Sequence, residues 1–151
     1  MKLDGTIDID ARAAAVWQVV IDPVDLAACV PGVGAVRQVD ARTFEGTVRA
    51  SVGPIDGDFA FRSVLTRTEF PDDLVVDVDG TDSVTNSRIV AHVEASLGEG
   101  TPGRTTLTYH ATVNVKGRLA IIGEMVLRAT ASVMIGQVTR CLRSRLEVAS
   151  R

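Results

Sequence analysis

Residues 105–133, TTLTYHATVNVKGRLAIIGEMVLRATASV, pass from one hydrophobic period to another. Over 105–115 the apolar side chains occupy every second position, as in a strand with one buried face. From Leu119 onward they recur at helical spacing, through Ile122, Val126, Ala129 and Val133. The stretch predicts a strand that leads into a long helix, which we expect to run to about Val148.

Upstream segments repeat the strand pattern. Residues 43–52 alternate cleanly, with Phe44 and Val48 on one face and Glu45 on the other. Similar alternation, broken by turn residues, predicts further strands around residues 3–9, 36–39, 59–66, 74–78 and 87–97, with turns at 53–57, 71–73 and 98–103.

Two short helices are expected after the first strand. Asp10 is predicted to cap a helix over residues 11–20, and Asp22 with Pro23 to begin a second that ends before Pro31. The element order is therefore one strand, two short helices, about six strands and one long helix. This order indicates an α+β fold with an antiparallel sheet. A helix spanning about 45 Å needs a large concave partner, and a curved sheet of about seven strands supplies it.

Composition narrows the class of protein. The 151 residues suit one domain, 1–151, and a net charge of −3 argues against nucleic acid as a partner. The N-terminus lacks the apolar run of a signal peptide, and no stretch approaches the roughly 20 apolar residues of a membrane span. Cys29 and Cys141 form no CxxC motif, so we expect buried, reduced cysteines in a cytoplasmic protein.

Several positions on the predicted inner face are too small to fill a core, among them Gly46, Ala50 and Ala91. Either the helix packs closely over them or they leave a cavity, and the pattern alone does not choose. A long helix over a strongly curved sheet favours the cavity, which would form an apolar ligand site. Its expected lining is Phe44, Val48, Phe59, Phe61, Leu65, Val76, Ile89, Val93, Tyr109, Ile122, Met125, Val126 and Ala129.

Few polar side chains are predicted to face this ligand site. The Tyr109 hydroxyl would orient a ligand carbonyl, or else bond to the backbone as a core tyrosine. His92 and His110 fall on outer faces and would lie opposite each other if their hairpin pairs symmetrically about its loop. With both histidines outside, we expect no catalytic residue, no metal and no cofactor.

The end of the long helix is basic. Arg140, Arg143 and Arg145 would either contact anionic lipid or an acidic partner at the inner membrane face, or complement the helix dipole in solvent.

Four stretches together resemble the carbon monoxide dehydrogenase CoxG family of the START-like, helix-grip (SRPBCC) superfamily. They are residues 22–33, which end in Cys-Val-Pro-Gly-Val, residues 44–48 together with 52–54, the Thr-rich strand at 105–109, and VKGRLAIIG at 115–123.

The resemblance implies a helix-grip cavity that holds a lipid or quinone, and a role beside a molybdenum hydroxylase of the carbon monoxide dehydrogenase type. It names no catalytic residue. Many members carry an extension after the long helix, whereas this sequence ends at Arg151. The alternatives are a cyclase- or aromatase-like enzyme on the same fold, or an assembly factor that docks on a partner oxidoreductase and has no cavity.

Overall fold

The computed structural model describes residues 1–69 and 73–149. Most of the turn expected at 71–73 lies outside the described residues. The elements are β1 (Lys2–Ile9), α1 (Ala13–Val20), α2 (Pro23–Ala27), β2 (Val33–Gln38), β3 (Thr43–Val52), β4 (Ile55–Glu69), β5 (Asp73–Asp82), β6 (Ser87–Thr101), β7 (Arg104–Lys116), α3 (Arg118–Ile121) and α4 (Glu124–Ala149).

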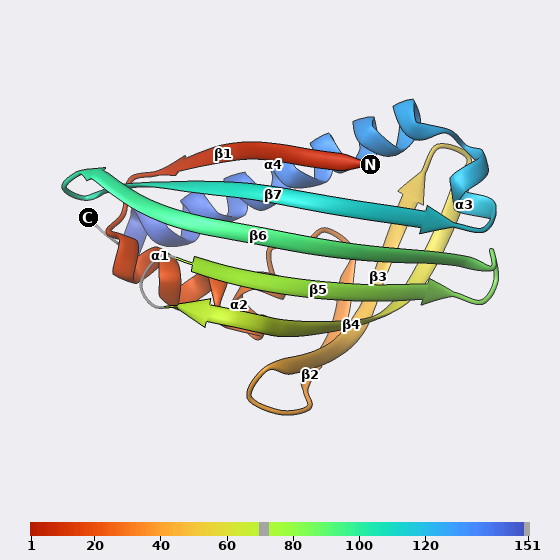
Figure 1. The fold of residues 1–151 in the computed structure, drawn as a ribbon, viewed down its shortest axis with the longest axis horizontal. Coiled ribbons are helices and arrows are strands. Elements are labelled where there is room, and N and C mark those ends of the chain that lie inside the picture. The colour runs from red at the N-terminus through yellow and green to blue at the C-terminus, as the bar shows by residue number, and fades with distance from the viewer. Residues whose placement is uncertain (70–72, 150–151) are drawn as a thin grey trace.

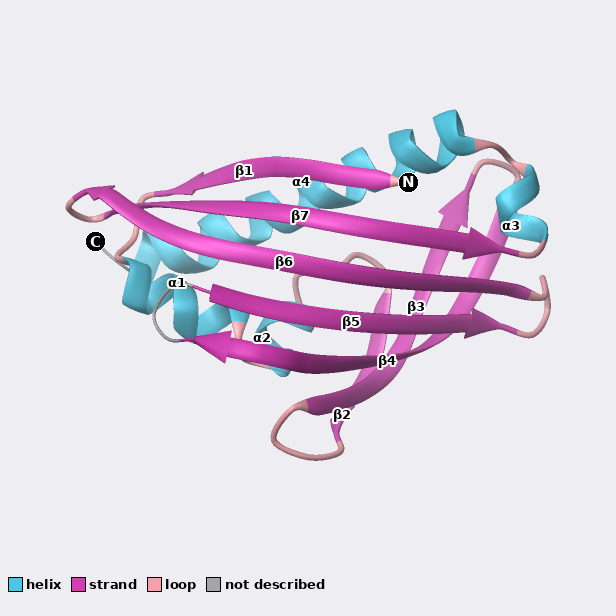
Figure 2. Cartoon of the chain, viewed as in Figure 1, coloured by secondary structure: helices cyan, strands magenta, loops and turns pink. Residues whose placement is uncertain are grey.

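Seven antiparallel strands form one sheet in the order β1-β7-β6-β5-β4-β3-β2. The sheet is strongly curved, and α4 lies along its concave side (Figures 1 and 2). The predicted architecture, a curved antiparallel sheet around a long C-terminal helix with two short helices after the first strand, is confirmed. None of the helices in the described part of the chain combines the length and the apolar character that a membrane span requires.

Side-chain carboxylates accept hydrogen bonds at the starts of both α1 and α2, but only the cap of α2 is the one predicted. The Asp22 carboxylate accepts hydrogen bonds from the backbone N–H groups of Val24 and Asp25, at 2.9 and 3.2 Å, so the expected cap of α2 is present. The predicted Asp10 cap is wrong, because α1 begins at Ala13 and its N-cap position is Arg12. There the Glu99 carboxylate accepts from the Ala13 N–H at 2.7 Å.

The C-terminal helix is interrupted, which corrects the prediction of one helix from Leu119. Gly123 has a φ of +102°, a conformation that ends α3 and lets α4 start with a new helical phase. Leu119 of α3 is almost completely buried, and its backbone N–H donates to the Ser87 hydroxyl at 3.0 Å. The short α3 therefore closes one end of the space beneath the sheet.

In the part of the chain that the structure describes, most buried apolar residues belong to one of two clusters at opposite ends of α4. A small cluster near α3 contains Val52, Phe59 and Leu119. A larger cluster joins β1, α1, α2 and the last turns of α4, and its members are Ile7, Ile9, Ala11, Val16, Trp17, Val20, Cys29, Leu74, Leu97, Leu107, Leu142 and Leu146.

Candidate functional site

The inner face of the sheet between the two clusters is apolar but not fully buried. Phe44, Val48, Phe61 and Val93 lie on this face, and each keeps part of its surface exposed although α4 passes over the sheet. Phe44 and Phe61 pack edge to face, with ring centroids 6.5 Å apart. A core that closed on itself would bury such side chains, so the middle of the helix and the sheet do not fully close against each other.

A groove opens at this region, between the loop side of the sheet and α4. One side is the α2–β2 loop with neighbouring β3, and the other is the middle of α4. The loop is fixed to the sheet, because the Arg49 N–H donates to the Gly32 carbonyl at 2.8 Å. The groove holds about 320 Å³ and is lined by Pro31, Gly32, Arg49, Ala50, Ser51, Thr130, Val133, Met134 and Gln137.

The predicted lining residues divide into three groups. Phe59 and Leu65 are buried. Met125, Val126 and Ala129 are exposed. The remaining eight are partly buried, namely Phe44, Val48, Phe61, Val76, Ile89, Val93, Tyr109 and Ile122.

The exposure of Met125, Val126 and Ala129 corrects the predicted orientation of the helix. Met125 is 86% exposed and Val126 36%, because the break at Gly123 shifts the phase of α4. The face that α4 turns inward instead carries Leu127, Thr130, Ala131, Met134, Ile135 and Val138. The contribution of Thr130, Met134 and Gln137 to the groove was not predicted from the sequence. Gly123 is the one sequence signal that would have revealed it.

The small residues of the inner face behave in two ways. A Cβ at Gly46 would lie 3.1 Å from the Phe61 ring, so close packing fills the space at that position. Ala50, on the same face of β3, instead lines the groove. At Gly46 the neighbouring strands fill the space, rather than the helix, whereas at Ala50 the space is open.

A second hollow lies at the β5–β6 turn and has a polar lining. It holds about 440 Å³, and Arg88 on its rim is paired with Asp79 at 2.6 Å. Asp82 and Ser87 line it, and between them the Thr85 hydroxyl donates to the buried Asp82 carboxylate at 2.8 Å and lies 3.0 Å from the Ser87 hydroxyl. That hydrogen bond, with backbone N–H donors, lowers the pKa of Asp82. These polar groups satisfy one another, which is the arrangement of a structural turn.

The two histidines lie on the outer face, as predicted, but not opposite each other. His92 faces Thr112 across the β6–β7 pairing, and His110 faces Glu94. His92 Nδ1 lies 2.6 Å from the Asp77 carboxylate, while His110 Nδ1 lies 2.7 Å from that of Asp4. Within residues 1–69 and 73–149, no three His, Cys, Asp or Glu side chains are grouped to hold a metal ion.

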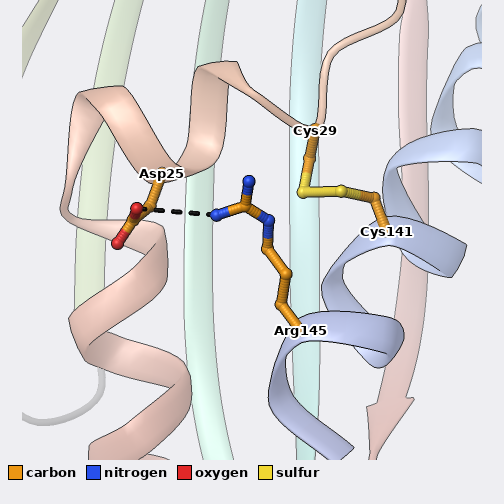
Figure 3. Close-up of a disulfide and its surroundings, with 4 residues drawn as sticks. All are labelled: Asp25, Cys29, Cys141 and Arg145. Carbon is orange, nitrogen blue, oxygen red and sulfur yellow. Dashed lines mark ion pairs between the residues drawn. A yellow bond between two sulfur atoms is a disulfide. The ribbon is translucent and has the colours of Figure 1, made fainter. Parts of the chain in front are cut away.

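The cysteines differ from the expectation of two reduced thiols. Cys29, after α2, and Cys141, on α4, form a disulfide across a sequence separation of 112 residues, with Cα atoms 5.4 Å apart (Figure 3). Both residues contribute to the larger core cluster, so their predicted burial holds for Cys29 and in part for Cys141. The fold brings them together, and their spacing in the sequence contains no sign of it.

The basic end of α4 is largely engaged within the chain. Arg143 Nε donates to the Asp8 carbonyl at 3.0 Å, and Arg145 pairs with Asp25 at 3.5 Å (Figure 3). Arg140 is exposed. The structure thus gives two of the three arginines a role in holding α4 against the N-terminal elements.

Solved structures share this fold. A conserved protein from Geobacillus kaustophilus superposes with a TM-score of 0.92 at 18% identity, covering 100% of this chain and 98% of that chain. A START superfamily protein from Mycobacterium smegmatis gives 0.72 at 15%, with 98% of each chain covered. The Zhui aromatase/cyclase from Streptomyces sp. R1128 gives 0.70 at 15%, with 100% and 96% covered. At such identities the likeness establishes the START-like helix-grip fold alone.

Comparison with curated proteins found no match. The family of the CoxG subunit of carbon monoxide dehydrogenase matches over residues 5–147. The matched range contains α1, α2, α3 and every strand, apart from the first three residues of β1. It also contains α4 almost to its end. The chain therefore belongs to the carbon monoxide dehydrogenase CoxG family.

Proposed function

We propose that this protein binds an apolar, quinone-like molecule between the sheet and α4, and that it does so without catalysing a reaction. The observation that carries the proposal is the partly uncovered apolar inner face, which lies between two buried clusters and beside an open groove. Apolar surface that is left uncovered by the fold gains free energy when a ligand covers it.

The chemistry of the groove favours binding over catalysis. Among its lining residues Arg49 alone is charged, and that side chain is directed to Asp58, 3.8 Å away on the neighbouring strand. General acid–base catalysis needs titratable groups within hydrogen-bond reach of the substrate. On the inner face beyond the groove, the partly buried Phe44 and Phe61 instead offer apolar surface to a ligand.

The size of the groove limits the class of ligand. Small-molecule sites commonly hold about 300–1,000 Å³. A groove of about 320 Å³ accommodates a ring-sized head group, and an aliphatic tail would extend over the inner face of the sheet. The proposed partner follows from membership of the family. It is a molybdenum hydroxylase of the carbon monoxide dehydrogenase type, to which this protein would carry the ligand.

The test is uptake of decylubiquinone and of the apolar dye N-phenyl-1-naphthylamine by the purified protein and two variants. Ala50→Trp places a large ring in the groove, whereas Ala60→Trp makes the same change on the outer face of β4. We expect wild type and Ala60→Trp to bind both probes, and Ala50→Trp to bind them at least about tenfold more weakly. Circular dichroism confirms that both variants fold. Absence of binding by the wild type, or equal binding by both variants, would overturn the proposal.

A further inference from the structure

The disulfide joins the two sides of the groove. Cys29 precedes Pro31 of the loop side by two residues, and Cys141 follows Gln137 of the helix side by four. Four residues correspond to about one turn of helix, or about 6 Å along its axis. The covalent link therefore lies at one end of the groove and limits how far its sides can separate.

An ion pair also joins these elements, and it is weak. Asp25 of α2 and Arg145 of α4 form an ion pair at 3.5 Å, with both side chains more than 40% exposed (Figure 3). Exposed pairs of this kind contribute little to stability, because solvent screens the two charges. Leu142 and Leu146 anchor the end of α4 in the larger cluster, beyond the groove. Beside the groove itself, the disulfide is the covalent link between the loop side and α4.

We infer that the Cys29–Cys141 disulfide is a redox-controlled gate on this groove, an inference that rests on the proposed function. In the oxidised protein the loop side is held against α4, and a bound apolar molecule exchanges slowly. In the reduced protein residues 28–31 can move away from α4 while Gly32 stays bonded to Arg49, and the molecule exchanges faster. A ligand-carrying protein with such a gate holds or releases its cargo according to the thiol redox state around it.

The reduction follows ordinary thiol–disulfide exchange with a dithiol reductant. Cys141 is less buried than Cys29, so we take Cys141 Sγ as the point of attack. A thiolate of the reductant bonds to Cys141 Sγ, the Sγ–Sγ bond breaks, and Cys29 leaves as a thiolate that takes up a proton. The second thiol of the reductant then displaces Cys141, which also takes up a proton. The reductant ends as a disulfide, having supplied two electrons.

The experiment measures the dissociation rate of N-phenyl-1-naphthylamine in a stopped-flow instrument. It compares oxidised wild type, wild type reduced with dithiothreitol, and a Cys29→Ser/Cys141→Ser double variant. Mass spectrometry counts the thiols, and circular dichroism follows the fold. We expect dissociation to be about tenfold faster after reduction, since such differences arise mainly in the dissociation rate. The double variant should match the reduced wild type and should not respond to dithiothreitol.

The outcomes separate the gate from the proposed function. Equal dissociation rates in folded oxidised and reduced protein would overturn the gate and leave ligand binding intact. Failure of the dye and of decylubiquinone to bind in either redox state would overturn both. Unfolding upon reduction would also overturn the gate, because the disulfide would then be a structural link. A rate in the double variant that still responds to dithiothreitol would show that another effect of the reagent is responsible.

Discussion

The Tyr109 ring lies over Gly5, its partner across the β7–β1 pairing, in the space that a side chain at Gly5 would occupy. A Cβ on Gly5 would overlap the Tyr109 hydroxyl and lie 2.7 Å from the ring carbon that bears it. The hydroxyl is therefore placed above β1. Whether it also contacts a ligand, as the sequence predicts, stays a prediction.

Gly5→Ala should consequently destabilise the protein through overpacking. We expect a loss of about 1–3 kcal/mol in the free energy of unfolding, measured by urea denaturation. In a Tyr109→Leu background the same change should cost less, because the smaller side chain leaves room for the methyl group. The double-mutant cycle should give a coupling of at least about 0.5 kcal/mol. An equal cost of Gly5→Ala in both backgrounds would show that the ring does not occupy this space.

The strands could be predicted from the sequence because their signal is local. In β3 each residue alternates between the inner and the outer face, so ten consecutive residues contain the whole pattern. The cap of α2 was equally accessible, since Asp22 bonds to residues two and three positions away.

The features that were missed depend on residues distant in the chain. Glu99 caps a helix 86 residues upstream, and the Cys29–Cys141 disulfide spans 112 residues. Both require the completed sheet, so no local pattern could reveal them. The orientation of α4 was predicted wrongly for another reason. One glycine, Gly123, resets the helical phase, and a continuous helix drawn from Leu119 therefore turns Met125 rather than Met134 toward the sheet.

The pKa of His92 should be raised, chiefly by its hydrogen bond with the Asp77 carboxylate at 2.6 Å and then by Glu94 at 3.4 Å. Because the folded state binds this proton more tightly, the stabilisation is complete below the unfolded pKa of about 6.5 and is lost as the pH rises through the folded pKa. NMR titration of the His92 ring should show that Asp77→Asn lowers the pKa. The control Asp79→Asn removes a carboxylate that is paired with Arg88, and it should leave the pKa of His92 nearly unchanged. Identical titration curves in Asp77→Asn and wild type would contradict the assignment.

Asp82 should make the stability of the turn before β6 sensitive to acid. Its pKa is lowered, first by the hydrogen bond from Thr85 and then by backbone donors that include Val84. A lowered folded pKa gives a contribution that is present above the unfolded pKa of about 3.9 and is lost as the pH falls through the folded value. Asp82→Asn should therefore lower stability at pH 6 more than at pH 3, as measured by urea denaturation at both values. A difference from wild type that does not change with pH would rule out ionised Asp82 as the stabilising form.

Gly117 and Gly123 frame α3, and the same substitution at each should have unequal costs. Both have positive φ, +86° and +102°, which an alanine adopts only with strain. A Cβ at Gly123 would meet no atom within 4 Å, so Gly123→Ala should cost only that strain, about 1–2 kcal/mol.

A Cβ at Gly117 would also overlap the Asn86 carbonyl oxygen, which is backbone and cannot rotate away. Gly117→Ala should therefore cost at least about 2 kcal/mol more, since the β5–β6 turn must shift to admit the methyl group. Urea denaturation of the two variants measures the difference directly, and equal losses would mean that the Asn86 carbonyl does not lie against Gly117 in solution.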